Sequence, residues 1–184
     1  MPMWAIVLII VIVLLILFVV SKYNSLIGAR NKVRDQFSQI DVQLKKRADL
    51  IPNLVETVKG YAKHESETLE SVMKARNTYL SANNNDSKMK ASSELSGAVS
   101  KLFALAESYP ELKANTNFEE LQKQLKDVED KISYARQFYN DAVLMYNNNI
   151  EMFPSNIVAS MFHFTKESFF EADDKERENV KVQF

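Results

Sequence analysis

Apolar residues recur along residues 26–62 at alternating steps of three and four. This spacing places them on one face of a helix, as in the seam of a coiled coil. Two successive steps of four, on either side of Leu44, lengthen the repeat and locally straighten the supercoil. The pattern predicts one long helix that continues past Gly60 to about residue 80. The predicted seam consists of Leu26, Val33, Phe37, Ile40, Leu44, Ala48, Ile51, Val55, Val58 and Ala62, with Arg30 between the first two.

Pro52 falls inside this predicted helix. A proline in a helix interior costs about 3 kcal/mol, because it removes one hydrogen bond and its ring clashes with the preceding turn. Asp49 can cap a new helix that has Pro52 in its first turn, or one helix can continue with a kink. Since the seam keeps its phase across Pro52, we expect a kinked, continuous helix.

Two further amphipathic segments follow the polar run at 81–88. The first covers about 89–109, with Leu95, Val99, Leu102, Ala106 and Tyr109 on one face. Residues 109–117 are predicted to form a loop, and Asn117 to cap the longest regular seam of the chain. Pro154 ends that helix, and a short helix over 156–162 follows. The seam consists of Phe118, Leu121, Leu125, Val128, Ile132, Ala135, Tyr139, Ala142, Tyr146, Asn149 and Phe153.

The composition agrees with a wholly helical chain, since only three Gly and four Pro occur in 184 residues. Each predicted helix has one apolar stripe and a charged back, so the stripes must pack together. Short connections favour an elongated antiparallel bundle of three to four long helices. We therefore predict an all-α fold with a membrane anchor at 1–23, a bundle at 24–161 and an aromatic, acidic tail at 162–184.

Residues 4–20 form an uncharged run of 17 apolar residues, bracketed by Trp4 and Tyr23. As a helix it is about 26 Å long, at the short end of what crosses a bilayer. A cleaved signal peptide would have a basic N-terminal region and a small-residue cleavage site, neither of which is present. The run therefore predicts a single transmembrane helix, with Trp4, Val20 and Tyr23 at its boundaries.

The charges beside this span predict its orientation. Lys22, Arg30, Lys32 and Arg34 follow the span before the first acidic residue, Asp35. Positively charged flanks stay in the cytoplasm, so we expect a single-pass protein of the cell membrane with a cytoplasmic bundle; the alternative is extracytoplasmic. The lipid bilayer is the first predicted partner.

Catalytic patterns are missing from the sequence. It has no Cys, and its two histidines are distant. His64-Glu65 begins a zinc-protease motif, but Thr68 stands where the second His is required. The residues three before each His are not Glu, as a di-iron bundle would need. We expect no catalytic, metal-binding or cofactor-binding residues and no enzyme activity, and the net charge of −1 indicates no nucleic-acid partner.

Two groups of residues are candidates for protein interaction. Lys45, Lys46 and Arg47 are predicted on the solvated face of the first helix, where they either bind an acidic partner or lipid surface or are merely hydrated. The tail carries Phe169, Phe170 and Phe184, which dock on this or a sister bundle, bind another protein, or remain disordered. Residues 180–184 alternate like a strand. Phe138, Tyr139 and Tyr146 are predicted to be core residues rather than an aromatic box.

Several long motifs resemble the LemA family of bacterial membrane proteins. They include IDVQLKKRADLIPNLV at 40–55, LSGAVSKL at 95–102, YPELKANTNF at 109–118, ISYARQFYNDAVLMYN at 132–147 and FPSNIVA at 153–159. The likeness covers nearly the whole chain, with Phe37 standing where the family often has Trp. It implies a single-pass anchor, a long helical bundle and a family-level link to membrane organisation or protein quality control. It implies no catalytic residues.

Taken together, these patterns predict a membrane-anchored helical scaffold that acts by self-association, as a homo-oligomer, and by protein binding, with a role in organising or shaping the membrane. The alternative is an adaptor that presents its basic face or tail to a membrane enzyme such as a protease.

Overall fold

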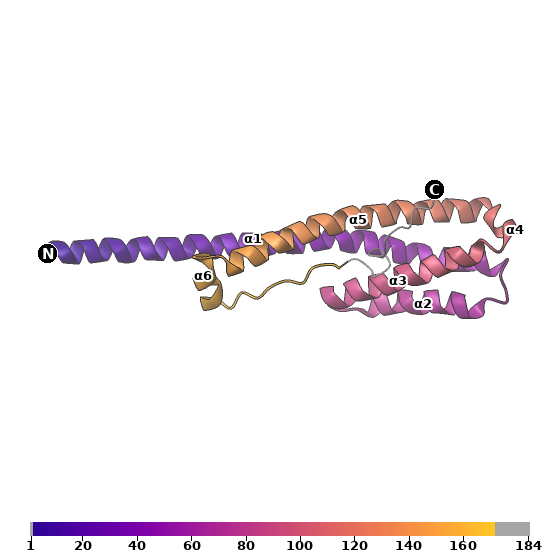
Figure 1. The fold of residues 1–184 in the computed structure, drawn as a ribbon, viewed down its shortest axis with the longest axis horizontal. Coiled ribbons are helices and arrows are strands. Elements are labelled where there is room, and N and C mark those ends of the chain that lie inside the picture. The colour runs from indigo at the N-terminus through magenta and orange to yellow at the C-terminus, as the bar shows by residue number, and fades with distance from the viewer. Residues whose placement is uncertain (1, 172–184) are drawn as a thin grey trace, which may run out of the picture. The chain divides into compact units, whose positions relative to one another are not determined.

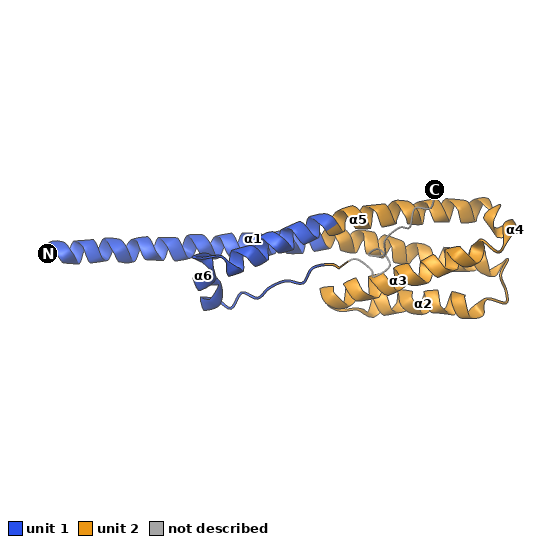
Figure 2. Ribbon diagram, viewed as in Figure 1, with its two compact units in different colours: residues 1–37, 137–169 blue, residues 38–136, 170–184 orange. Residues whose placement is uncertain are grey.

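The computed structural model describes residues 2–171 and divides the chain into two compact units. Unit 1 comprises residues 1–37 and 137–169, and unit 2 comprises residues 38–136 and 170–184 (Figure 2). No strand occurs within residues 2–171, so the predicted all-α class is confirmed. The strand-like run at 180–184 lies outside the described residues.

Helices account for the regular structure of the described chain (Figure 1). The long helices α1 and α5 each contribute residues to both units, whereas α2, α3 and α4 belong to unit 2 and α6 belongs to unit 1. The bounds are α1 Met3–Lys59, α2 Ser66–Ser81, α3 Asn85–Ala106, α4 Pro110–Lys113, α5 Thr116–Glu151 and α6 Ser155–Met161.

The predicted seam of the first helix is confirmed, because all ten of its apolar residues from Leu26 to Ala62 are buried. Pro52 lies inside α1, which runs through it without interruption. The helix therefore does not restart at Asp49, and the kink at Pro52 stays a prediction.

The prediction that this helix continues past Gly60 is wrong. α1 ends at Lys59, and the amides of Tyr61 and Ala62 both bind the Val58 carbonyl oxygen, at 3.0 and 2.9 Å, to form a turn. Glycine is a weak helix former, and here it follows the last helical residue. Periodicity did not reveal the break, because Ala62 is buried within the turn and Leu69 is buried in the next helix.

The predicted break at 81–88 is present between α2 and α3, but α3 begins at Asn85, earlier than expected. Asn84 caps it: the Asn84 side chain accepts a 2.8 Å hydrogen bond from the Ser87 amide, and Ser87 Oγ accepts one from the Asn84 amide. This reciprocal pair satisfies two backbone donors at the helix start.

The connection to α5 also differs from the prediction. The segment expected to be a loop contains the four-residue helix α4, which begins at Pro110. Asn115, not Asn117, caps α5, because its side chain accepts a 3.0 Å hydrogen bond from the Phe118 amide. Both asparagines precede the apolar seam, and the one directly before Thr116 occupies the cap.

Unit 2 is a helical bundle around one apolar core, to which α1, α2, α3, α4 and α5 all contribute (Figure 1). α2 and α3 lie side by side and run in opposite directions, as their short connection requires. The core includes Ile51, Leu54, Val58, Leu69, Val72, Leu95, Leu102, Leu112, Phe118 and Leu125.

The cap of α3 generates a stability prediction. Asn84→Ala removes the side-chain acceptor for the Ser87 amide and should lower the free energy of unfolding by about 1 kcal/mol. Asn83→Ala, next to it and also exposed, is the matched control and should change it by less than about 0.5 kcal/mol. The measurement is urea unfolding of the full chain in mild detergent, followed by far-ultraviolet circular dichroism; equal effects of the two variants would contradict the assigned cap.

Candidate functional site

Arg47 does not lie on the solvated face where it was predicted. Its side chain is 2 % exposed, and its guanidinium joins three helices of unit 2. Nη1 donates to Glu129 Oε2 at 2.9 Å and to Ser96 Oγ at 2.6 Å, and Nη2 donates to the carbonyl oxygen and Oγ of Ser92, at 3.0 and 2.8 Å. The position falls between Leu44 and Ala48, next to the seam, where a long side chain reaches the facing helices. Arg47 is therefore a structural cross-link.

Lys45 and Lys46 are exposed, as expected. Lys45 pairs with Asp49, one helical turn away, at 3.3 Å. Lys131 donates a hydrogen bond to Asp127 that lowers the pKa of this carboxyl, and Lys46 lowers it further through its charge. The basic face thus carries acidic neighbours of its own.

Residues 162–169 return along α5 within unit 1, and we call them the C-terminal strap. Three side chains of α5 bind its backbone. Tyr139 Oη donates to the Ser168 carbonyl at 2.9 Å, and Tyr146 Oη donates to the Thr165 carbonyl at 3.0 Å. Asn147 binds Glu167 twice: Nδ2 donates to the Glu167 carbonyl at 2.9 Å, and Oδ1 accepts from the Glu167 amide at 3.0 Å.

Tyr139 and Tyr146 are buried, so their predicted place in the core is confirmed. Their hydrogen bonds to the strap were not predicted. Burial, followed by the nearby Glu167 carboxylate, raises the pKa of Tyr146, so its hydroxyl stays a neutral donor. The signal in the sequence was two tyrosines at predicted core positions seven apart, since buried hydroxyl groups need partners. Asn147, beside this seam, gave no such signal, and only the structure shows that it is buried.

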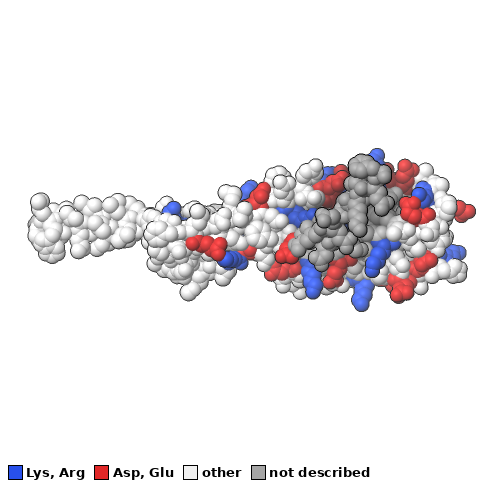
Figure 3. All heavy atoms as spheres, in the orientation of Figure 1, with Lys and Arg blue, Asp and Glu red and all other residues white. Residues whose placement is uncertain are grey.

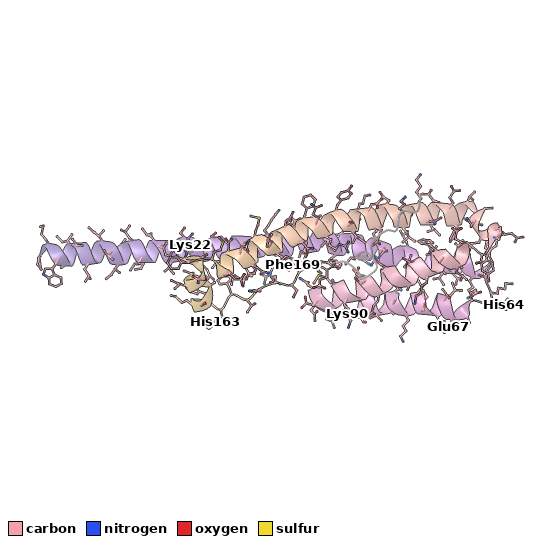
Figure 4. The ribbon with its side chains drawn as sticks, in the orientation of Figure 1. Lys22, His64, Glu67, Lys90, His163 and Phe169 are labelled. Atoms are coloured by element: carbon pink, nitrogen blue, oxygen red, sulfur yellow. The ribbon has the colours of Figure 1, made fainter. Side chains whose placement is uncertain are left out.

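The predicted aromatic tail residues lie in different surroundings. Phe169 is about half exposed (Figure 4), whereas Phe170 is buried, with the Arg136 guanidinium 5.7 Å from its ring centroid. Phe170 is therefore covered within the single chain. Phe184 lies outside the described residues.

One face of α5 in unit 1 is apolar and exposed. Phe138 and Met145 of α5, and Met152 directly after its last residue Glu151, recur every seven residues and are 60 %, 67 % and 62 % exposed. The prediction that Phe138 is a core residue is wrong, because its neighbour Tyr139 occupies the buried face instead. We call these three residues the α5 stripe.

A second exposed apolar surface lies at the turn from α5 to α6. Phe153, predicted as the last residue of the α5 seam, is 80 % exposed, because α5 ends at Glu151 and the chain turns away. Ile157 and Met161 of α6 are also exposed. We call Phe153, Ile157, Met161 and Phe162 the α6 corner.

The opposite side of α6 packs against α1. Val158 and Ala159 form a buried cluster with Leu26, and Val19, Tyr23 and Phe164 pack around it. The Tyr23 ring centroid lies 4.7 Å from that of Phe162 and 5.8 Å from that of Phe164. α6 is therefore fixed to residues 19–26 of α1.

The end of α6 has the hydrogen bonds of a Schellman motif, which reverses the chain into the strap. The His163 amide binds the Ser160 carbonyl at 3.3 Å, and the Phe164 amide binds the Ala159 carbonyl at 2.9 Å. His163 has a φ of 54°, the left-handed conformation that this motif requires. Phe164 then packs on the Ala159 cluster, and the Arg30 guanidinium lies over its ring, 5.2 Å from the ring centroid.

Arg30 was predicted on the seam of the first helix, and its side chain is half-buried at this position.

The apolar run at 4–20 forms the start of α1, and none of its most apolar window is buried in the protein. By length and composition it is the one candidate membrane span within residues 2–171. Trp4 and Val20 are exposed, whereas Tyr23 contacts the α6 region. In Figure 3 this segment is white, without charged side chains, while the remaining surface on that face carries both signs.

The part of the chain that the structure describes contains no group of three or more His, Cys, Asp or Glu that could hold a metal ion. His64 belongs to unit 2 and His163 to unit 1, each beside the start or end of a helix (Figure 4).

The family model for LemA matches residues 36–184, four-fifths of the chain. The chain belongs to the LemA family. The expected resemblance is confirmed over unit 2, the α5 stripe, the α6 corner and the strap alike.

Curated relatives of this LemA-family chain include Protein LemA of Metamycoplasma hominis, which is 25 % identical over 88 % of this chain and 74 % of its own length. Magnetosome proteins MamQ 1 and MamQ 2 of Paramagnetospirillum magneticum are each 22 % identical over 87 % of this chain and 68 % of theirs. None of these names is that of an enzyme. Within residues 2–171, the present chain is helical and has one candidate membrane span.

Variants of the basic residues test whether Arg47 has a structural role that Lys46 lacks. Arg47→Ala removes all four hydrogen bonds and leaves a gap, so it should lower the free energy of unfolding by about 3 kcal/mol. Lys46→Ala is the matched control and should change it by no more than about 0.5 kcal/mol. Urea unfolding of the full chain measures both; a stable Arg47→Ala protein would show that the buried guanidinium does not hold unit 2.

The strap depends on Asn147 as both donor and acceptor. Asn147→Asp replaces the donor with a carboxylate that faces the Glu167 carbonyl, so the strap should open more often. Amide hydrogen exchange at Glu167 should accelerate by roughly fivefold to tenfold, the equivalent of about 1 kcal/mol for one hydrogen bond.

Asn148→Asp adds the same charge at the adjacent, exposed position and should leave this exchange rate unchanged. Mass spectrometry of the exchanged strap peptides reads out both variants. Equal protection in Asn147→Asp and the wild type would contradict the role of this side chain.

Proposed function

We propose that this LemA-family protein is a membrane-anchored helical scaffold that acts by self-association and protein binding rather than by catalysis. The observation that carries the proposal is the α5 stripe. Apolar side chains repeated every seven residues are the pattern by which a helix packs on another helix, and here they face away from their own unit. A second copy supplies a matching helix.

Membrane attachment supports such an assembly. The first residues of α1 expose only apolar side chains, which a bilayer covers. Anchoring holds copies in one plane with the same side facing the membrane, which raises their effective concentration for weak lateral contacts. A two-fold pair of stripes would be self-complementary, and repeated contacts would organise or shape the membrane. The basic residues after the span favour the cytoplasmic side.

An adaptor role is the second candidate function. Lys45, Lys46 and Phe169 are exposed and available to a membrane enzyme such as a protease. Arg47 cannot bind a partner without breaking its hydrogen bonds within unit 2, so the basic surface of an adaptor would consist of the two lysines. Under this alternative the protein stays small by itself and binds its partner through these residues.

The α5 stripe provides the test. The double variant Phe138→Glu, Met145→Glu places charges on the proposed contact between copies. Its particle mass in mild detergent, measured by light scattering, should fall from that of an assembly to that of one chain, because unpaired charges are costly to bury. Both positions are exposed in the single chain, so its helical content should be retained.

Val42→Glu is the matched control, since Val42 is an equally exposed apolar residue on α1. It should leave the mass unchanged. A wild-type protein that is a single chain at every concentration would contradict self-association. In that case Lys45→Glu, Lys46→Glu, combined with cross-linking in native membranes, tests the adaptor: loss of one defined cross-linked partner is expected.

A further inference from the structure

The α6 corner lies beside the end of the candidate membrane span. Val19, within the apolar run, and Tyr23, just after it, both pack on the cluster that fixes α6. Figure 4 shows Lys22, the first charged residue of the chain, at the level of α6 along α1. Headgroups meet a spanning helix where its apolar run gives way to charge. α6 is thus held at the height of that boundary.

The chemistry of this segment fits the boundary as well. Residues 152–165 contain no Asp, Glu, Lys or Arg, the longest such run after the span. The surface of α6 is correspondingly white in Figure 3. The helix buries Val158 and Ala159 against α1 and exposes Ile157 and Met161 on its other side. One apolar face of α6 is therefore covered by the protein, and the other is left uncovered.

We propose that the α6 corner inserts into the membrane interface as a second, monotopic contact beside the transmembrane helix. Apolar faces of interfacial helices lie about 5–10 Å into the boundary between headgroups and acyl chains. Phe153, Ile157, Met161 and Phe162 supply such a face. One ion pair flanks it: Lys166 pairs with Glu151, just outside the two ends of the uncharged run. The occupant of this surface is lipid, not a second protein.

This inference rests on the anchoring part of the proposed function and adds a site to it. The Schellman turn at His163 and the strap hold α6 in place from the other side, since Tyr146 binds Thr165 at the end of the uncharged run. The corner is therefore preorganised, and insertion does not require folding of a new segment.

Depth-dependent fluorescence quenching tests the inference on the full chain in vesicles. Trp4→Phe removes the single native tryptophan, and Phe153→Trp or Met161→Trp then reports from the α6 corner. In phosphatidylcholine vesicles, both probes should emit at a shorter wavelength than a water-exposed tryptophan. Brominated acyl chains should lower their intensity relative to vesicles without bromine. The loss should be larger with bromine near the headgroup than with bromine near the terminal methyl.

Two reference probes separate this inference from anchoring itself. Ile12→Trp, at the middle of the apolar run, should be quenched most by bromine near the terminal methyl. Val42→Trp, twenty residues along α1 beyond Lys22, should keep its intensity in all vesicles. If Ile12→Trp is quenched while the α6 probes behave like Val42→Trp, insertion of the corner is wrong and the anchor stands. If Ile12→Trp is also unquenched, anchoring is wrong and the inference falls with it.

Discussion

One helix supplies the organising element of both units. α1 begins with apolar side chains that the protein leaves uncovered and continues with a seam whose apolar residues from Leu26 to Val58 are all buried. The change between these two regimes occurs around Tyr23, within one uninterrupted helix. The surroundings of α1 therefore differ along its length. Its first residues have no covering within the protein, whereas its seam is covered by the other helices.

Polar cross-links specify how these partners pack. Two helices whose apolar residues are regularly spaced can still pack after one of them slides by a heptad, since one aliphatic contact replaces another. Arg47 cannot shift in this way, because only one register brings Ser92, Ser96 and Glu129 within hydrogen-bonding distance of its guanidinium. A misaligned bundle would leave that charge buried without partners. In unit 1, Asn147 does the same for the strap, whose backbone is bound in one register only.

Periodicity predicted the buried faces of α1, α3 and α5 almost residue by residue, because a helix exposes its pattern in the chain itself. It failed where the pattern stays compatible with two structures. Ala62 fits the seam of a continuing helix and equally the interior of a turn, so the break after Lys59 was missed. Arg47 has the charge of a surface residue, but its partners are 45 to 82 residues away in the chain and invisible to local spacing. The tyrosines were predicted as core, but their role depends on the path of a strap that has no periodicity.

Apart from the apolar run at 4–20, unit 1 has two exposed apolar surfaces, the α5 stripe and the α6 corner, which meet in the sequence at Met152 and Phe153. This adjacency links the two proposals. A span alone lets a protein tilt and rotate in the bilayer, whereas a second contact on one side of the span restricts its tilt. If α6 lies in the interface, the α5 stripe of the same unit would be held at a defined height above the membrane. Copies would then present their stripes to each other in the same orientation, which would lower the entropy lost when they associate. An interfacial helix would thus strengthen self-association without contributing a single contact between copies.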